Sequence, residues 1–252
     1  MSDGAAGSQG ALRLFSDPLE ALPPAAVAPG ITVVGSKTAS GAAERILAEL
    51  PPHEVFIELF AGGAGLTRRK RPCELTLLFE REPHQVRRLQ RHFAGRSDVQ
   101  IVLADSLSVL LPTRLPQGAV IYADPPYPLS TRRNRRYYVH DWADAEHERF
   151  LTWAAAVTVP MLISCYACQQ YDRALSAWRR SEYFYMSRGG RRCEQLWCNF
   201  PPAQRRAEPH LAGEDYRARQ RIKRKVARWR RRFLSCGPAE RAAIMQALLA
   251  AE

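Results

Sequence analysis

Residues 122–128 read Tyr-Ala-Asp-Pro-Pro-Tyr-Pro and follow the apolar run 118–121. Two successive prolines cannot continue a sheet, because each lacks a backbone N–H group. Asp124 would then stand at the end of a buried strand as a hydrogen-bond acceptor, with the carbonyl of Pro125 beside it as a second. Two such acceptors suit an exocyclic amine on a base, and Tyr127 could stack on an extruded base. An ordinary proline-rich turn is the alternative interpretation.

A second group of residues predicts a ligand site. The turn FAGGAG at 60–65 follows another apolar run, and glycines there allow close backbone approach and can open a helix. The next two apolar runs end in Glu80, which could accept both hydroxyls of a ribose, and in Asp105, which could accept from an exocyclic amine. Upstream, Lys37 offers a cation for a carboxylate. Together they predict a nucleoside with an amino-acid tail, S-adenosylmethionine.

Apolar runs typical of buried strands alternate along the chain with segments of helical periodicity, and these elements are expected to position the residues above. These patterns predict an α/β fold in which a parallel sheet has helices on both faces. Because ligands bind at the carboxyl ends of such strands, the acids and the glycine turn should meet at one edge. The expected strands are 53–60, 75–80, 99–105, 119–124 and 159–166, with a closing pair at 182–186 and 194–200, and the expected helices are 40–50, 83–93 and 144–156.

Composition divides the chain into three parts. Residues 1–30 have little periodicity and predict a flexible N-terminal arm, 31–202 form the α/β domain, and 203–252 form a basic helical extension. In the extension, apolar residues recur at helical spacing and alternate with a basic face. A second short helix follows Gly237-Pro238. The hairpin could pack on the core with its charges solvated, but we favour contact with nucleic acid. The apolar residues at helical spacing in the first, basic helix are Ile222, Val226, Trp229 and Phe233.

The 252-residue chain carries a formal net charge of +12 and has a pI of about 9.9, which favours a polyanionic partner such as nucleic acid. No apolar run is long enough to span a membrane, and no secretory signal is expected. The six cysteines are scattered, as for reduced thiols in a cytoplasmic protein. The pairs Cys165/Cys168 and Cys193/Cys198 could ligate zinc, but the spacing of the second pair points its thiols to opposite faces. We therefore expect no metal.

Between Ile31 and Phe200 the chain resembles the amino-methylating DNA methyltransferases of the adenine-N6 type, of which Dam is the familiar member. The resemblance implies a Rossmann-like class I methyltransferase sheet. Its marks are GSK (35–37), FIELFAGGAG (56–65), LLFE (77–80), LAD (103–105), DPPY (124–127), ISCY (163–166) and EQLWCNF (194–200). It implies that S-adenosylmethionine is bound by Lys37, Glu58, Phe60, Gly62, Gly63, Glu80 and Asp105. It implies that the catalytic motif is Asp124, Pro125, Pro126 and Tyr127.

This chain departs from the family pattern. Ala64 and Cys165 stand where relatives often have glycine, and only about 60 residues separate the glycine turn from DPPY. That is room for two strands and two helices, but not for an inserted target-recognition domain. DNA contacts are therefore expected elsewhere. The candidates are the loop 130–138 with Arg132, Arg133, Arg135 and Arg136, the loop 188–192 with Arg191, and the C-terminal helix with Arg224, Arg228 and Arg231.

The expected function is site-specific transfer of a methyl group from S-adenosylmethionine to the N6 amino group of adenine in double-stranded DNA, by base flipping. The enzyme would act in the cytoplasm as a monomer or homodimer, without a membrane. The same motif also serves amino-group methylation of RNA, whereas enzymes that methylate cytosine N4 in DNA more often have serine in its first position, with some overlap. A non-catalytic nucleic-acid-binding protein is the alternative from a different class, which the intact Asp124, Tyr127 and Glu80 disfavour.

Overall fold

A computed structural model describes residues 41–131, 141–187, 190–202, 207–208, 211 and 216–250. Within these residues strands and helices alternate, as the sequence predicts. The strands are β1 (Val55–Leu59), β2 (Leu75–Glu80), β3 (Val99–Leu103), β4 (Ala119–Ala123), β5 (Met161–Cys165), β6 (Arg179–Ser187) and β7 (Gly190–Cys198). The helices are α2 (Ala42–Leu47), α3 (Pro83–His92), α4 (Ser106–Val109), η2 (Leu129–Thr131), α5 (Asp144–Ala155), α6 (Gln169–Ala174), α7 (Tyr216–Ser235) and α8 (Pro238–Leu249).

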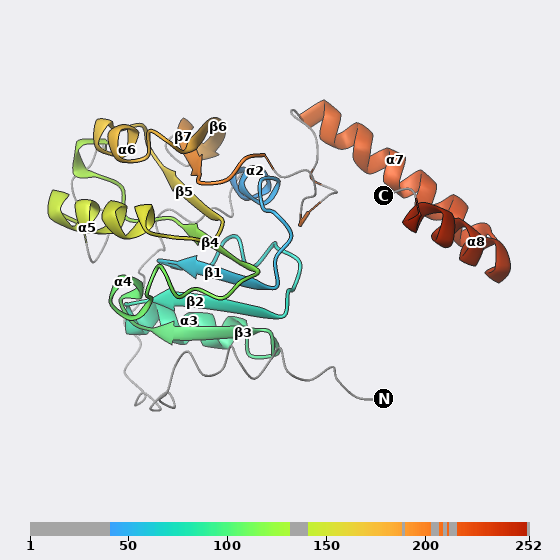
Figure 1. Ribbon diagram of the computed structural model, residues 1–252, viewed down its shortest axis with the longest axis horizontal. Helices are drawn as coiled ribbons and strands as arrows, with labels where there is room; N and C mark the ends of the chain where they lie inside the picture. The colour runs from blue at the N-terminus through green and yellow to red at the C-terminus, as the bar shows by residue number, and fades with distance from the viewer. Residues whose placement is uncertain are drawn as a thin grey trace.

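The seven strands form one sheet in the order β3-β2-β1-β4-β5-β7-β6 (Figure 1). The first five are parallel, whereas β7 runs antiparallel between β5 and β6. This order, with a reversed β7, is that of the class I methyltransferase fold, so the predicted fold is confirmed. Because the order changes direction beside β1 and β4, the ends of these two strands flank the switch point where ligands of such sheets bind.

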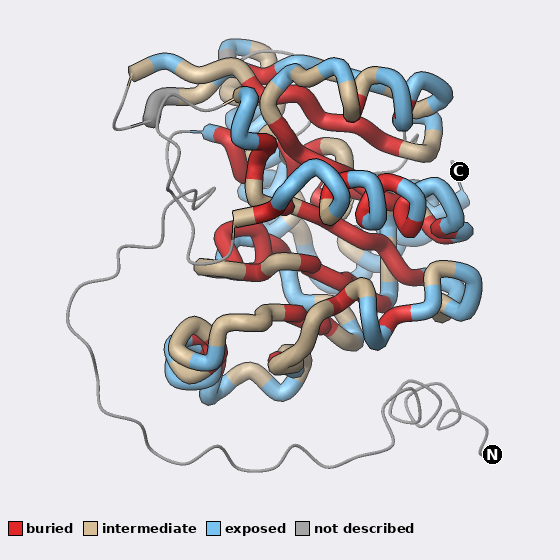
Figure 2. Tube along the Cα trace, turned by 90° about the vertical axis from the view of Figure 1, so that its left-hand side faces the viewer, coloured by how far each residue is buried: buried red, intermediate tan, exposed pale blue. Residues whose placement is uncertain are grey.

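Helices cover both faces of the sheet. One face packs with α5 and α6 around residues such as Ile57, Ile121 and Phe150. The other packs with α2 around Phe56 and with α3 around Leu78. β1, β4 and β5 are buried along their whole length, which explains why they read as mainly apolar runs, although β1 contains Glu58 and β5 contains Ser164. The buried stretches of the chain lie in the interior of the domain (Figure 2). The central strands are therefore held from both sides, and their carboxyl ends form a fixed edge.

Two sequence expectations about local structure are wrong. The chain after the glycine turn does not open a regular helix; residues 65–69 form successive turns, with bonds such as Lys70 N to Leu66 O at 2.8 Å. The segment 188–192 is not a loop throughout, because β7 already begins at Gly190 and includes Arg191. By contrast, β2, α3, β3 and α4 do form the chain between the glycine turn and β4, the strand that ends at the catalytic motif, so the predicted two strands and two helices are confirmed.

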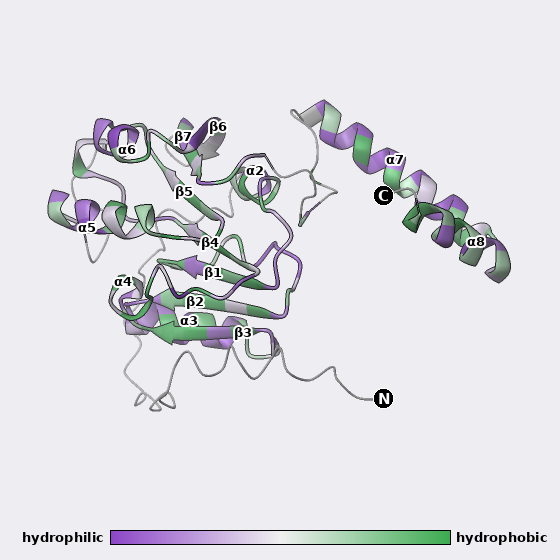
Figure 3. Ribbon diagram, in the orientation of Figure 1, coloured by the Kyte–Doolittle hydropathy of each residue, from purple (hydrophilic) through white to green (hydrophobic). Residues whose placement is uncertain are grey.

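The C-terminal helices α7 and α8 lie to one side of the sheet (Figure 1), and α7 is strongly hydrophilic along much of its length (Figure 3). Their apolar residues are largely exposed, with Trp229 58% and Leu248 62% accessible. The interpretation of a hairpin packed on the core is therefore wrong. Among the described residues, no helix has both the length and the apolar character needed to cross a membrane.

Candidate active site

The glycine turn adopts a backbone that few residue types accept. Phe60, Gly62 and Ala64 all have positive φ, at 56°, 50° and 48°. Glycine adopts this conformation freely, whereas Phe60 and Ala64 are strained there. The turn is closed by Ala64 N donating to Ala61 O at 2.6 Å, while Ala61 N donates to Phe79 O at 2.8 Å. The strain marks the turn as a site whose shape is held by its surroundings.

Glu80, at the end of β2, holds the turn directly. Its Oε2 accepts from the backbone N–H of Gly62 at 2.8 Å, and its Oε1 accepts from Glu82 N at 2.9 Å. A carboxylate oxygen has two lone pairs, so each oxygen can accept one further hydrogen bond. Glu80 is half-buried. The carboxylate therefore has the capacity to accept from the two hydroxyls of a ribose beside the glycine turn.

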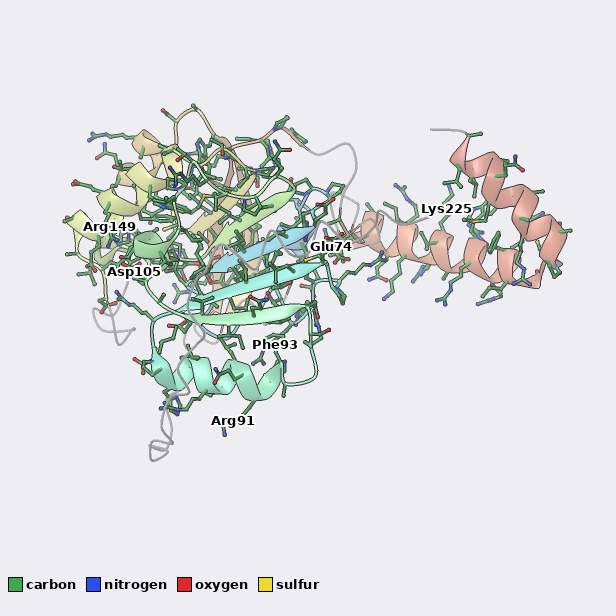
Figure 4. The ribbon with its side chains drawn as sticks, turned by 60° about the horizontal axis from the view of Figure 1, so that its bottom comes forward. Glu74, Arg91, Phe93, Asp105, Arg149 and Lys225 are labelled. Carbon is green, nitrogen blue, oxygen red and sulfur yellow. The ribbon has the colours of Figure 1, made fainter. Side chains whose placement is uncertain are left out.

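Asp105 follows β3 and caps the short helix α4. Its Oδ1 accepts from Leu107 N at 3.1 Å, and its Oδ2 accepts from the hydroxyl of Ser108 at 2.9 Å and from Arg149 at 3.1 Å. Figure 4 shows Asp105 and Arg149 lying together, far from Glu74 at the opposite end of the sheet. Burial acts to raise the pKa of Asp105, but the bonds from Ser108, Leu107 and Arg149 outweigh it and lower the pKa. A ligand amine would share this carboxylate with Arg149.

Glu58 lies beneath the glycine turn. Only 3% of it is exposed, and its Oε2 accepts from the hydroxyl of Thr67 at 2.5 Å and from Thr67 N at 3.2 Å. Burial raises the pKa of Glu58 to about 7; the bonds from Thr67 oppose this, and the charge of Asp124 adds to it. The carboxyl thus links β1 to Thr67 across the glycine turn, and its protonation is coupled to the charge of Asp124.

The pH dependence of stability tests this environment. Because the pKa of Glu58 is raised in the folded state, the folded chain binds a proton more tightly than the unfolded chain between pH 4.5 and about 7. The contribution of Glu58 to the free energy of unfolding therefore falls as the pH rises through that window, and it stays low at higher pH. We expect Glu58→Gln, which keeps an acceptor for Thr67, to be more stable than wild type at pH 8 by roughly 2–3 kcal/mol.

Urea unfolding at pH 4.5 and pH 8 measures the difference between Glu58→Gln and the wild type. The exposed Glu74→Gln, at the other end of the sheet, is the matched control and should be nearly neutral at both pH values (Figure 4). Equal stabilities of wild type and Glu58→Gln at pH 8 would contradict a raised pKa at Glu58.

Asp124 is half-buried immediately after β4. Its Oδ1 accepts from the hydroxyl of Ser164 on β5 at 3.2 Å, and that hydroxyl is 2.8 Å from the hydroxyl of Tyr122. Ser164 and Tyr122 are fully buried or nearly so. The carboxylate is therefore oriented from a neighbouring strand at the same sheet edge as Glu80 and the glycine turn.

Tyr127 is 6% exposed and packs edge-on against Tyr166, with ring centroids 4.6 Å apart. Pro125 is buried and Pro126 half-buried, so the motif is enclosed by the core. Burial, followed by the charge of Asp124, raises the pKa of Tyr127 well above its usual value. Tyr127 is therefore a neutral aromatic wall that packs against Tyr166.

A buried carboxyl group that sequence reasoning missed supports this wall. Glu194 on β7 is fully buried and accepts from the hydroxyls of Tyr183 and Tyr185, the latter at 2.7 Å. The hydroxyl of Tyr185 is 3.4 Å from that of Tyr166. The motifs ISCY and EQLWCNF contain Ser164, Tyr166 and Glu194, but a polar residue inside an apolar run does not reveal its partner on another strand.

Comparisons with known proteins give only distant similarities. No protein-family model and no curated protein matches the chain. Solved structures that are similar in fold include the N-methyltransferase NodS from Bradyrhizobium japonicum (10% identity, 63% of this chain and 93% of that one, TM-score 0.45). Others are a SAM-dependent methyltransferase from Leishmania major (17%, 62% and 69%, 0.44) and the 23S rRNA methyltransferase ErmE (15%, 72% and 81%, 0.39). These similarities concern the fold alone, and the residues of the site must indicate the function.

Phe60, which the sequence predicts at the ligand site, also packs against the core. Its ring packs edge-on against Trp142, with centroids 5.0 Å apart, and against Phe150 at 5.6 Å. The ring thus joins the core beside α5, and only the part that remains exposed could touch a ligand. Gly62 and Gly63 stand in the turn as predicted, half-buried and without side chains to obstruct a ligand.

Several predicted contact residues cannot be placed. Lys37 and the loop arginines Arg132, Arg133, Arg135 and Arg136 lie outside the described residues. Of the others, Arg191 is exposed on β7, and Arg224, Arg228 and Arg231 are exposed on α7, away from the site edge (Figure 1).

The cysteines do not converge. Cys165 packs on the α5 face of the sheet and Cys198 on the α2 face, so the thiols point into different core clusters. Among the described residues no group of three histidine, cysteine or acidic side chains could hold a metal ion.

Proposed function

We propose that this chain transfers a methyl group from S-adenosylmethionine to the N6 amino group of an adenine flipped out of double-stranded DNA. The main support is the position of Asp124: a carboxylate oriented by Ser164 stands at the same sheet edge as the glycine turn that Glu80 holds. Asp124 would bind the target amine at the end of one strand, and the glycine turn would bind the methyl donor at the end of the neighbouring strand. This arrangement suits transfer of a methyl group from the donor to the amine.

The residues around the glycine turn fit S-adenosylmethionine as a ligand. Glu80 can accept two more hydrogen bonds, the glycines leave the turn open, and Asp105 offers a carboxylate of lowered pKa for an amine. Glu58 is a positioning residue in this proposal, because its carboxyl on β1 accepts from Thr67 on the other side of the turn. Lys37 would bind the ligand carboxylate. Bound there, S-adenosylmethionine supplies an electrophilic methyl group on a positively charged sulfur.

Asp124 and Pro125 act on the target amine. The Asp124 carboxylate accepts one N–H and the Pro125 carbonyl accepts the other, which favours a tetrahedral nitrogen with its lone pair toward the methyl group. The N–C bond forms as the S–C bond breaks, and the nitrogen then gives up one proton through the Asp124 carboxylate to solvent. Tyr127, whose ring packs on Tyr166, would offer a stacking surface to the flipped base, and stacking would offset part of the cost of unpairing.

Labelled S-adenosylmethionine tests this proposal. The chain is incubated with the labelled donor and either duplex DNA or RNA, and the nucleosides are separated. We expect label in N6-methyladenine from DNA. Label in N4-methylcytosine or in RNA would identify one of the alternative substrates, and the absence of transfer to any of them would favour a non-catalytic binding protein.

The arginine-rich loop follows soon after Tyr127 in the chain. We propose that at least one of its arginines reads a base and that others bind phosphates. These arginines are Arg132, Arg133, Arg135 and Arg136. A base-reading arginine changed to alanine should relax sequence preference at one position.

The arginines of α7 are proposed to bind phosphates without reading sequence. Arg224, Arg228 and Arg231 are exposed and recur at a spacing that places them on one side of the helix. Changing all three to alanine should weaken binding to every DNA sequence alike. The slope of log K against log salt should flatten by about 0.9 for each phosphate that the variant no longer neutralises. Salt-titrated fluorescence anisotropy measures both effects.

The matched control for α7 changes the same three arginines to lysine, which keeps the charge and should keep most of the salt dependence. If the alanine variant instead changes which DNA sites are methylated, these arginines read sequence and the assignment to phosphates is wrong.

A further inference from the structure

The β6–β7 hairpin extends beyond the catalytic edge of the sheet. Asp124 stands beside Ser164, whose register partner on β7 is Leu196, itself paired with Ser181 on β6. β5 pairs with β7 only as far as Cys165 and Gln195, whereas β6 and β7 remain paired to Ser187 and Gly190. At about 3.3 Å per residue, this ribbon projects roughly 20 Å past the level of Asp124.

The root of this ribbon is tied to the catalytic motif. The buried carboxyl of Glu194 accepts from Tyr183 and Tyr185 across the two strands. Tyr185 in turn meets Tyr166, whose ring packs on Tyr127. These contacts between side chains position the ribbon relative to the site. The ribbon lies two to three strands from β4, about 10–15 Å to the side.

The other face of the ribbon carries an exposed aromatic ring beside an arginine. Phe184 alternates with Tyr183 and Tyr185, so its ring points to the opposite face, and it is 54% exposed. The guanidinium of Arg191 lies over this ring, 4.1 Å from its centroid. Among the described residues no carboxylate forms an ion pair with Arg191, whereas Arg180, nearer the start of β6, is paired with Asp172.

We propose that Phe184 and Arg191 form a contact surface for the DNA strand that flanks the flipped adenine. An exposed aromatic ring with an arginine over it offers two kinds of contact to DNA. A base can stack on the uncovered part of the ring, and the guanidinium can bind a phosphate or the edge of a guanine. A two-stranded ribbon also fits the major groove of duplex DNA. The net charge of +12 suits the same partner.

This inference rests on the proposed function for its substrate but is tested by binding. Full-length wild type, Phe184→Ala and Arg191→Ala are titrated into fluorescein-labelled duplex DNA of mixed sequence. We expect each substitution to raise Kd about tenfold, the effect of losing one stacked base. Affinity for S-adenosylhomocysteine, measured by calorimetry, should not change, because neither residue lies in the turn held by Glu80.

Arg180→Ala is the matched control, an arginine on the same hairpin whose charge is already paired; it should bind DNA like the wild type. Phe184→Tyr should also retain affinity, since it keeps the ring. Wild-type affinity in both Phe184→Ala and Arg191→Ala would overturn the inference, as would a loss confined to an RNA probe.

The two proposals can fail separately. If the wild type binds DNA through Phe184 and Arg191 but transfers no methyl group to adenine, the proposed function is wrong and the contact surface stands. If the wild type methylates adenine and Phe184→Ala binds and methylates in the same way, the contact surface is wrong and the function stands.

Discussion

Asp124→Ala is expected to abolish methyl transfer while the chain remains folded. The substitution removes the acceptor that would orient the target amine, and loss of one such positioned polar group costs roughly a hundredfold or more in rate. The hydroxyl of Ser164 loses its acceptor on Asp124 but remains next to Tyr122, so the core should tolerate the change. Single-turnover transfer from labelled S-adenosylmethionine measures the rate, and thermal unfolding checks the fold.

Asp124→Asn is the informative companion. The amide has nearly the same volume and can still accept from Ser164, but it presents N–H groups where the carboxylate would accept from the amine. Transfer should therefore fall as severely as with alanine. Turnover close to wild type in either variant would remove Asp124 from the chemistry and with it the central assignment.

Glu80→Ala is expected to weaken binding of S-adenosylhomocysteine by about 10–100-fold, the value of losing hydrogen bonds to a charged group. The alanine also frees the N–H of Gly62, so the glycine turn loses the acceptor that helps to hold it in its strained shape. The rate at saturating S-adenosylmethionine should fall much less than the affinity. Calorimetry gives the affinity and initial rates give the turnover.

Glu80→Gln separates the two effects of Glu80. Its amide oxygen can still accept from Gly62 N, so the turn should stay in place while the charge-assisted bonds to a ribose are weakened. An intermediate affinity is expected. Glu74→Ala, at the other end of β2, is the control for removing a carboxylate near this strand (Figure 4). Unchanged affinity in Glu80→Ala would exclude Glu80 from the site.

The positions of the strand ends follow from local sequence. Buried parallel strands read as short apolar runs, and each run here ends in a residue that cannot continue the pattern: the glycine turn after β1, Glu80, Asp105 and Asp124. Parallel strands place these ends at one edge, so the acids proposed for catalysis and ligand binding could be predicted together. The conformation of the turn itself could not, since its positive φ values are held by contacts from β2, where Glu80 accepts from Gly62 N and Phe79 O accepts from Ala61 N.

Contacts between distant segments needed the tertiary structure. Ser164 orients Asp124 only because β4 and β5 pair in one register, and Glu194 meets Tyr185 only because β7 runs antiparallel to β6. A shift of one residue would send each side chain to the opposite face. The same register decides that Arg191 lies in a strand over Phe184 rather than in a loop.

The sequence by itself determined the α/β class, the strand ends and the residue types that meet there, because burial periodicity and strand-ending residues are local properties of the chain. Only the tertiary structure decided how Asp124 is oriented, which buried network supports Tyr127, and that a β-ribbon reaches beyond the site, because these depend on pairing between strands far apart in the chain. Register is a collective property of the packed sheet, and no short segment encodes it alone.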